Sequence, residues 1–183
     1  DFYPSKGKER IKSMIETRPD WCVSRQRVWG VPLPIFISKK TGEVLVDDEV
    51  FENIAKIYEK EGSDCWFNED YQIFLGDKYK AEDYEKLSDI VEVWFDSGST
   101  HSFVLEKRDD LKWPASMYLE GSDQHRGWFH SSLLESCGTR GVAPFESILS
   151  HGFVVDGKGL KMSKSTGNVI APQDLSLIHI SEP

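Results

Sequence analysis

A lysine-rich segment near the carboxyl end is where residue types and spacing first point to chemistry. Residues 157–170, called the lysine loop below, hold three lysines and no acidic residue in a chain whose formal net charge is −9. The five residues 161–165 read Lys-Met-Ser-Lys-Ser, with glycines on both sides. Ammonium groups and hydroxyls suit phosphate oxygens, and glycines let the backbone approach a ligand closely. We therefore expect a phosphate-binding loop rather than a merely solvated basic one.

Three further segments combine charged, amide and aromatic side chains around glycines. They are residues 21–30 (WCVSRQRVWG), 94–99 (WFDSGS) and 120–129 (EGSDQHRGWF). In this order, and followed by the lysine loop, they resemble the class I isoleucyl-tRNA synthetases. The resemblance extends from about residue 19 to residue 174 and is specific because four motifs occur in sequence.

The resemblance implies activation of isoleucine by ATP, bound as its Mg²⁺ complex, and transfer of the aminoacyl group to tRNA(Ile). Phosphoryl-type transfer needs in-line positioning and neutralised charge on the phosphate oxygens. Lys164, and after it Lys161, are the catalytic residues that the resemblance implies. The other residues implied to bind ATP or the adenylate are Glu120, Gly121, Asp123, Gln124, His151, Ser163 and Ser165.

Several of these side chains also have a structural interpretation. Ser122 or Asp123 would serve as the cap of a helix starting near Gln124, although a cap explains only one of the clustered residues. His151 faces the nucleotide in one interpretation and is a satisfied buried histidine in the other.

Two tryptophans and two arginines complete the candidate site. Trp94 and Trp128 are expected to line the amino-acid pocket, although tryptophans are more often plain core residues. Arg25 and Arg27 lie between aromatic residues, a mixture that suits the end of a single-stranded RNA by stacking and phosphate pairing. For these arginines a surface role and contact with the tRNA end are equally favoured.

Composition limits the class of protein. An isoelectric point near 5.1 argues against indiscriminate nucleic-acid coating but allows one local RNA contact. No run approaches the roughly 20 apolar residues of a membrane-spanning helix, and the amino terminus lacks a secretory-signal layout. We expect a soluble cytoplasmic protein without membrane contact, and the resemblance implies a monomeric parent.

The cysteines are expected to be buried free thiols. Cys22, Cys65 and Cys137 are widely spaced and form no Cys-x-x-Cys pair. Some relatives in the resembled family carry cysteine pairs in the insert corresponding to residues 38–60, but residues 38–42 here read Ser-Lys-Lys-Thr-Gly. The sequence therefore predicts no zinc site and no other metal site.

The expected fold class is α/β. Apolar residues at helical spacing predict a helix over about 47–61, capped by Asp47 or Asp48 and closed by Gly62. Short apolar strands at 117–121 and 148–155, with a helix from about 124 to 140 between them, predict a parallel βαβ crossover. Because ligands lie beyond the carboxyl ends of parallel strands, residues 120–123 and 156–165 should converge on one crevice.

The resemblance implies the second half of a Rossmann-like parallel sheet with an inserted small αβ subdomain. Residues 1–37 would be the end of an upstream helix and the start of this catalytic half. Residues 38–88 would be the inserted connective subdomain, and residues 89–174 the Rossmann-like half with the lysine loop. Residues 175–183 resemble the translation of a library-preparation adapter, so we exclude them as an artefact.

Two alternatives stay open. A valyl or leucyl relative would share the lysine loop and the Ser-Arg-Gln motif, whereas residues 94–99 and 121–128 favour the isoleucyl pattern. A nucleotide- or RNA-binding module without catalysis is the second alternative, because residues 1–183 lack the His-x-Gly-His type motif of the other half of the ATP site. The isolated chain is expected to be inactive in either case.

Overall fold

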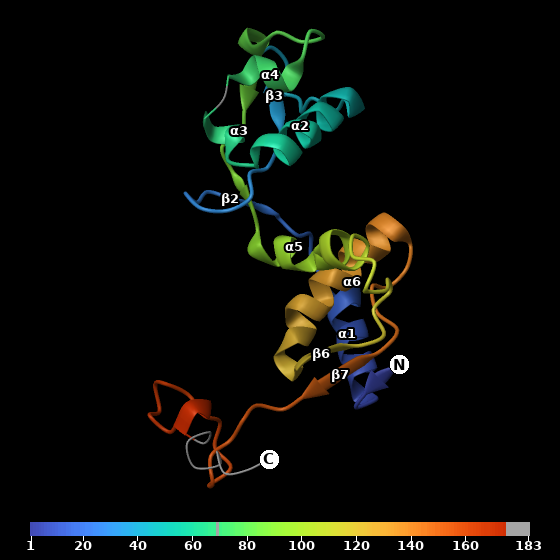
Figure 1. The fold of residues 1–183 in the computed structure, drawn as a ribbon, viewed down its shortest axis with the longest axis vertical. Helices are drawn as coiled ribbons and strands as arrows, with labels where there is room; N and C mark the ends of the chain where they lie inside the picture. Colours follow the sequence, from blue (N-terminus) through green and yellow to red (C-terminus); the bar gives the residue numbers. More distant parts are fainter. Residues whose placement is uncertain (69, 175–183) are drawn as a thin grey trace.

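The computed structural model describes residues 1–68 and 70–174. It contains a parallel sheet with strand order β1-β7-β6, in which β1 is Phe2–Tyr3, β6 is Tyr118–Gly121 and β7 is Ile148–His151 (Figure 1). Helix α6 (Trp128–Arg140) joins β6 to β7. Tyr118 pairs with Ile148, and Gly121 pairs with His151. The predicted α/β class and the parallel crossover are therefore confirmed.

The core of this unit lies between the sheet and two helices. Phe129 of α6 and Ile148 of β7 are almost fully buried, at 0% and 1% exposure. Ile11 of α1 (Lys6–Glu16) joins the same cluster. Strand β1 was not predicted, because two residues are too few to show the alternation of a strand.

Two boundaries differ from the prediction. Strand β7 ends at His151, and residues 153–155 are exposed apolar residues rather than strand. The pairing stops there because the partner strand β6 ends at Gly121, which is opposite His151. Helix α6 begins at Trp128 rather than near residue 124, because residues 122–126 form the 3₁₀ turn η3 (Ser122–Arg126).

Helix α5 (Val93–Gly98) packs against α6. A Cβ atom on Gly98 would lie only 2.1 Å from Glu135 Oε1, so this glycine lets the two helices approach closely. The π-helical turn η2 (His101–Leu105) follows α5. Upstream of α5, the strands β2 (Ser24–Arg25) and β5 (Ile90–Val91) pair antiparallel.

A second group of elements packs around its own core. Strands β3 (Phe36–Ser38) and β4 (Tyr84–Lys86) pair antiparallel beside the helices α2 (Asp48–Glu61), α3 (Cys65–Asn68) and α4 (Tyr71–Leu75) and the turn η1 (Ala81–Asp83). Trp66 and Phe74 are completely buried at its centre. We propose that this group is the inserted αβ subdomain over residues 38–88, which lies at the top of Figure 1.

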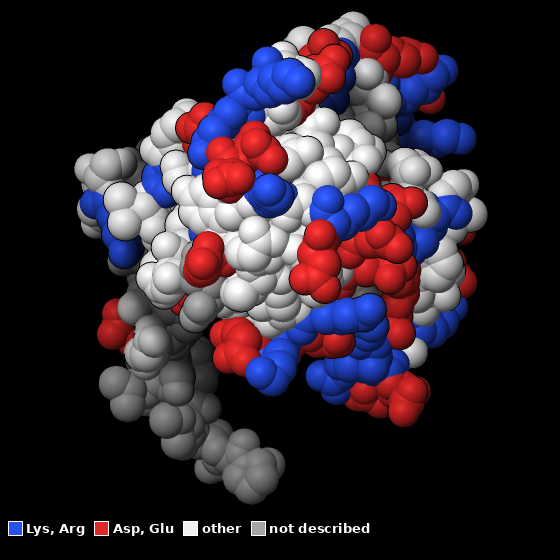
Figure 2. Space-filling model, turned by 90° about the horizontal axis from the view of Figure 1, so that it is seen from above, with Lys and Arg blue, Asp and Glu red and all other residues white. Residues whose placement is uncertain are grey.

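The surface mixes charges of both signs. On the face seen in Figure 2, Lys and Arg side chains are interspersed with Asp and Glu side chains. None of the helices in the described ranges is long and apolar enough to cross a membrane. The expected burial of all three thiols is wrong, because Cys65 is buried but Cys22 and Cys137 are exposed. Their positions in an exposed motif and in the last turns of α6 explain this exposure.

Helix α2 begins and ends at the predicted residues. The Asp47 carboxylate accepts a hydrogen bond from the Glu49 N–H (3.0 Å), and Gly62 ends the helix at a φ of 81°. Lys78 Nζ lies 2.6 Å from the same carboxylate, and the Tyr79 hydroxyl donates to it at 2.7 Å. The hydrogen bond from Lys78, followed by that from Tyr79, lowers the pKa of Asp47 to about 2.

This carboxylate makes a testable contribution to stability. Because its folded pKa lies below the usual 3.8, its stabilisation is complete above about pH 4 and is lost as the pH falls towards 2. We expect Asp47→Asn to lower the melting temperature at pH 6 and to have little effect at pH 2. The control is Asp48→Asn, the neighbouring exposed carboxylate, and circular dichroism melts of the chain measure both. An equal deficit for Asp47→Asn at both pH values would contradict the expectation.

Candidate functional site

The carboxyl ends of β6 and β7 bring five of the predicted site residues together. We call this group the strand-end corner; its members are Glu120, Gly121, Asp123, Gln124 and His151. A Cβ atom on Gly121 would lie 2.5 Å from Asp123 Oδ1 and 3.8 Å from His151 Cε1. Glycine is therefore required at the strand end for the carboxylate and the imidazole to lie this close to it. Glu120 and His151 are both exposed, so His151 is not a buried core histidine.

Gln124 connects the corner to helix α6. Its Nε2 donates to Asp123 Oδ2 (3.0 Å), and its Oε1 accepts from the Trp128 N–H (2.9 Å). The alternative interpretation, in which Ser122 or Asp123 caps the helix, is therefore wrong: α6 starts at Trp128, and Gln124 accepts the hydrogen bond of its first N–H group. The Asp123 carboxylate stays at the strand end, which leaves it available to a ligand.

His125 fixes the turn between the strand and the helix. Its side chain is 1% exposed, and its Nδ1–H donates to the Ser122 carbonyl oxygen at 2.9 Å. The ring also packs edge-on against Phe129. The burial of this histidine could not be predicted, because a polar residue in a charged motif gives no sign of burial.

The two tryptophans differ in their surroundings. Trp128 stacks on Tyr118 with a centroid distance of 4.0 Å and an interplanar angle of 6°, and its Nε1–H donates to the Ser97 carbonyl oxygen at 2.9 Å. Trp94 is 42% exposed. A Cβ atom on Gly127 would lie 3.1 Å from the Trp94 ring, so this ring lies beside the start of α6.

A groove of about 1200 Å³ runs beside the predicted RNA-contacting arginines. Arg25 and Arg27 both line it, together with Trp29, which is 88% exposed. The Arg25 guanidinium donates to the carbonyl oxygens of Cys22 and Ser24, at 2.7 and 2.8 Å, so Arg25 shapes the local backbone. Among residues 1–68 and 70–174, no hydrogen bond or ion pair holds the Arg27 side chain.

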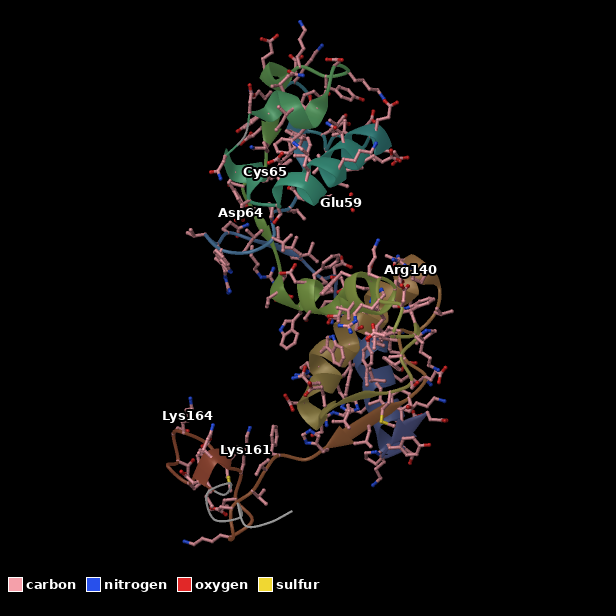
Figure 3. All side chains as sticks on the ribbon, viewed as in Figure 1. Glu59, Asp64, Cys65, Arg140, Lys161 and Lys164 are labelled. Carbon is pink, nitrogen blue, oxygen red and sulfur yellow. The ribbon has the colours of Figure 1, made fainter. Side chains whose placement is uncertain are left out.

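The lysine loop leaves the same edge of the sheet but lies away from the corner (Figures 1 and 3). In the described part of the chain, every side-chain and turn hydrogen bond of residues 153–174 stays within that segment. The expected convergence of residues 120–123 and 156–165 is therefore not seen. The physical reason is that residues 152–155 are exposed and leave the sheet without a pairing strand.

Within the loop, the predicted phosphate-binding residues lie close together. Ser163 Oγ is 3.2 Å from Ser165 Oγ, and both residues lie beside the exposed Lys164. Lys161 Nζ lies 3.6 Å above the centroid of the Phe153 ring, a cation–π contact. Figure 3 shows Lys161 and Lys164 in the same unit beyond β7.

An acidic group under α5 was not predicted from the sequence. Burial, reinforced by the nearby Asp96 carboxylate, raises the pKa of Glu135 to about 8. Burial and the charge of Glu92 also raise the pKa of Asp96. Nothing in the sequence signals this group, because Glu135 is half-buried on α6 and its Oε1 lies against Gly98, which is far away along the chain.

The part of the chain that the structure describes contains no assembled metal-binding site. No three His, Cys, Asp or Glu side chains there come together as a metal-binding group. The corner offers carboxylates and an imidazole that a nucleotide could contact, and the lysine loop offers ammonium and hydroxyl groups. The described residues therefore offer hydrogen-bond acceptors at the corner and positive charge in the lysine loop.

The chain belongs to the tRNA synthetases class I (I, L, M and V), a family that matches residues 1–179. Within that class, the chain is similar to the isoleucine–tRNA ligase of Pelagibacter ubique, with 85% identity over 174 residues that cover 95% of this chain and 19% of that protein. The isoleucine–tRNA ligase of Zymomonas mobilis is 59% identical over 171 residues, covering 93% of this chain and 18% of that protein.

These relatives confirm the resemblance to the isoleucyl enzymes. The chain spans about a fifth of the length of the relatives that it matches. A solved structure also shares the fold: the LeuRS of Agrobacterium radiobacter in a ternary complex with tRNA and LeuAMS has a TM-score of 0.58 and 21% identity. That match covers 92% of this chain and 25% of the LeuRS chain, and it confirms the Rossmann-like class of the fold.

The buried Glu135 carboxyl predicts a pH dependence of opposite sign to that of Asp47. An unfolded chain releases this proton near pH 4.5, whereas the folded chain keeps it up to about pH 8. The contribution of Glu135 to stability therefore falls as the pH rises from 4.5 to 8. We expect Glu135→Gln to raise the melting temperature at pH 8 relative to the unchanged chain, with little difference at pH 4.5.

The matched control is Glu59→Gln, which removes an exposed carboxylate from α2 (Figure 3). Thermal melts of the three chains at both pH values provide the measurement. A Glu135→Gln chain that gains nothing at pH 8 would show that the carboxyl is not held neutral beneath α5.

Proposed function

We propose that the protein containing this chain is an isoleucine–tRNA ligase that activates isoleucine with ATP and transfers it to tRNA(Ile). The observation that carries the proposal is 85% identity to an isoleucine–tRNA ligase over 174 residues, which include all four motifs. ATP enters as its Mg²⁺ complex, in keeping with the family. The chain covers one part of that protein, so we expect the isolated chain to bind ligands weakly and to lack activity.

The lysine loop supplies positive charge to the phosphates in this proposal. As pyrophosphate leaves, negative charge grows on the equatorial and leaving oxygens, and an ammonium group nearby stabilises it. Lys164 is exposed and unpaired in the described ranges, so its ammonium group is free to meet a phosphate. Lys161 is the second cation, and the hydroxyls of Ser163 and Ser165 are hydrogen-bond donors to phosphate oxygens.

The strand-end corner holds the nucleoside part. The carboxylates of Glu120 and Asp123 accept hydrogen bonds, which suits ribose hydroxyls, as acidic residues do in dinucleotide-binding folds. Gly121 leaves the backbone open to the ligand, and Gln124 presents an amide beside it. His151 lies at the neighbouring strand end, within reach of the same ligand. No general base is needed, because the attacking isoleucine carboxylate is already an anion.

Catalysis requires the lysine loop to swing towards the corner. The two parts leave one sheet edge and are joined through residues 152–153, since Met162 N–H already bonds to the Val154 carbonyl inside the loop unit. Rotation at this short exposed connection moves the loop without breaking any hydrogen bond that the described residues make to the sheet. Loop closures of this kind exclude water and complete a catalytic group.

We assign the remaining predicted residues to the amino-acid pocket and to the RNA contact. Trp94 is the better candidate for a pocket wall, because its exposed ring stands beside Gly127 at the corner. Trp128 supports the wall from below through its stack on Tyr118. Arg27 and Trp29 offer a charge and an exposed ring to an RNA end, and the LeuRS neighbour is a complex with tRNA.

Removing the ammonium group of Lys164 tests the proposed role of the loop. In the full-length protein, Lys164→Ala should lower isoleucine-dependent pyrophosphate exchange by on the order of 10²-fold, as expected when one charge-stabilising donor is lost. Lys158→Ala is the control, since it removes a lysine of the same loop that has no assigned role. Normal exchange by Lys164→Ala would refute the assignment. A protein that binds ATP but shows no exchange with any amino acid would favour the binding-module alternative.

The arginines make a separate prediction about tRNA. Arg27→Ala in the full-length protein should raise the KM for tRNA(Ile) by about 10-fold and weaken its salt dependence, because a phosphate contact is lost. Pyrophosphate exchange, which needs no tRNA, should stay unchanged. Lys40→Ala, at an exposed turn outside the groove, is the control. An unchanged KM for tRNA would indicate that Arg27 is an ordinary surface residue without a tRNA contact.

A further inference from the structure

A single carboxylate organises the turn that opens the lysine loop. Asp156 Oδ1 accepts hydrogen bonds from the backbone N–H groups of Lys158 and Leu160, both at 2.9 Å. The Asp156 N–H donates to the Leu160 carbonyl oxygen (2.8 Å), and Gly159 occupies the left-handed region at a φ of 78°. One acidic side chain therefore fixes the backbone immediately before Lys161.

Asn168 organises the other end of the loop. Its Oδ1 accepts from the Ser163 N–H at 3.0 Å, and its Nδ2 donates to the Lys161 carbonyl oxygen at 3.3 Å. Its Nδ2 also donates to Asp156 Oδ2 at 2.9 Å, a link between residues that are twelve positions apart. This hydrogen bond, with the two backbone N–H groups, holds the pKa of the Asp156 carboxyl below its usual range. Both residues are half-buried, in a segment whose other side chains are mostly exposed.

These contacts enclose the segment that carries the two catalytic candidates. Lys161 lies between the Asp156 turn and Asn168, and Ser163 is bonded to Asn168 directly. The segment packs little against the rest of the described chain, so its shape depends on bonds within itself. We call the Asp156–Asn168 pair the loop clip.

We propose that Asp156 and Asn168 are positioning residues that hold the Lys161–Lys164 segment in the shape in which it meets the phosphates. They touch no substrate themselves and act through the backbone of the lysines and serines. This inference rests on the proposed function, because it assigns the clip a role in the same site. The clip makes the loop a unit that moves as one body on residues 152–153.

The clip can be tested by exchanging its two members. In Asp156→Asn, an amide N–H₂ faces the Asn168 N–H₂, so two donors meet. In Asn168→Asp, two carboxylates face each other and repel. In the double exchange, the amide and the carboxylate trade places, which restores the donor–acceptor pair in reverse. The weak bond to the Lys161 carbonyl oxygen is replaced by a contact between two acceptor oxygens.

We expect each single variant of the full-length protein to lower kcat for pyrophosphate exchange by on the order of 10-fold, the effect of losing one charge-assisted hydrogen bond. The KM for isoleucine should be unchanged, because the amino-acid pocket is untouched. The double exchange should recover most of the rate. Asp174→Asn, which changes an exposed carboxylate of the same segment, is the control and should leave the rate unchanged.

A second measurement is independent of activity. Amide hydrogen exchange should speed up at Lys158, Leu160 and Ser163 in each single variant and slow again in the double exchange, with the global melting temperature unchanged. The proposal would be overturned if a single variant showed faster amide exchange in the loop but an unchanged rate of pyrophosphate exchange. It would also be overturned if the double variant had a lower rate than either single variant. If the full-length protein without any substitution showed no pyrophosphate exchange, the proposed function would be refuted. Amide hydrogen exchange would still test the clip in that case.

Discussion

The stack of Trp128 on Tyr118 is the interaction on which the arrangement of the site depends. The two rings lie parallel at 4.0 Å, so the first residue of α6 is fixed over the first residue of β6. The Tyr118 hydroxyl lies 3.1 Å from Ser132 Oγ one turn further along α6, and Trp128 Nε1–H reaches the Ser97 carbonyl of α5. Strand, crossover helix and α5 are thereby joined at one point. The turn between β6 and α6 must then close over a fixed distance, which places Asp123 and Gln124 at the strand end.

Close helix contact beneath this point has an electrostatic consequence. Gly98 lets α5 pack against the Glu135 carboxyl. Withdrawal of the carboxyl from water disfavours its charged form. A neutral Glu135 adds no further negative charge to a chain in which Glu120 and Asp123 already contribute carboxylates at the corner. Lysines at that edge are held on a separate segment. In the proposed function, the ammonium groups stay apart from the carboxylates until a polyphosphate lies between them, which limits direct pairing of the two.

The features that could be predicted from the sequence are those that depend on local interactions. The cap at Asp47 and the end at Gly62 could be predicted because each depends on neighbouring backbone groups. The crossover from β6 to β7 could also be predicted, since apolar strands on both sides of a helix have few arrangements. Strand β1 and the late start of α6 could not, because β1 is defined by pairing with β7 and the start of α6 by the Gln124 cap. The residue types of the site were visible in sequence, but the burial of His125 and Glu135 depends on partners far along the chain.

The separation of the corner from the lysine loop favours a division between a fixed part and a moving part. Ordering a flexible loop on a ligand costs conformational entropy, about 1–2 kcal/mol for each backbone residue that is fixed. A loop whose backbone is already held by Asp156 and Asn168 avoids most of that cost, so closure needs to restrict only the connection at residues 152–153. In the proposed function, more of the attraction between lysines and phosphates then remains available in the transition state, where the charge is greatest. An internally bonded loop on a short hinge thus combines mobility with a defined arrangement of charge, which neither a rigid edge nor an unstructured basic tail could supply.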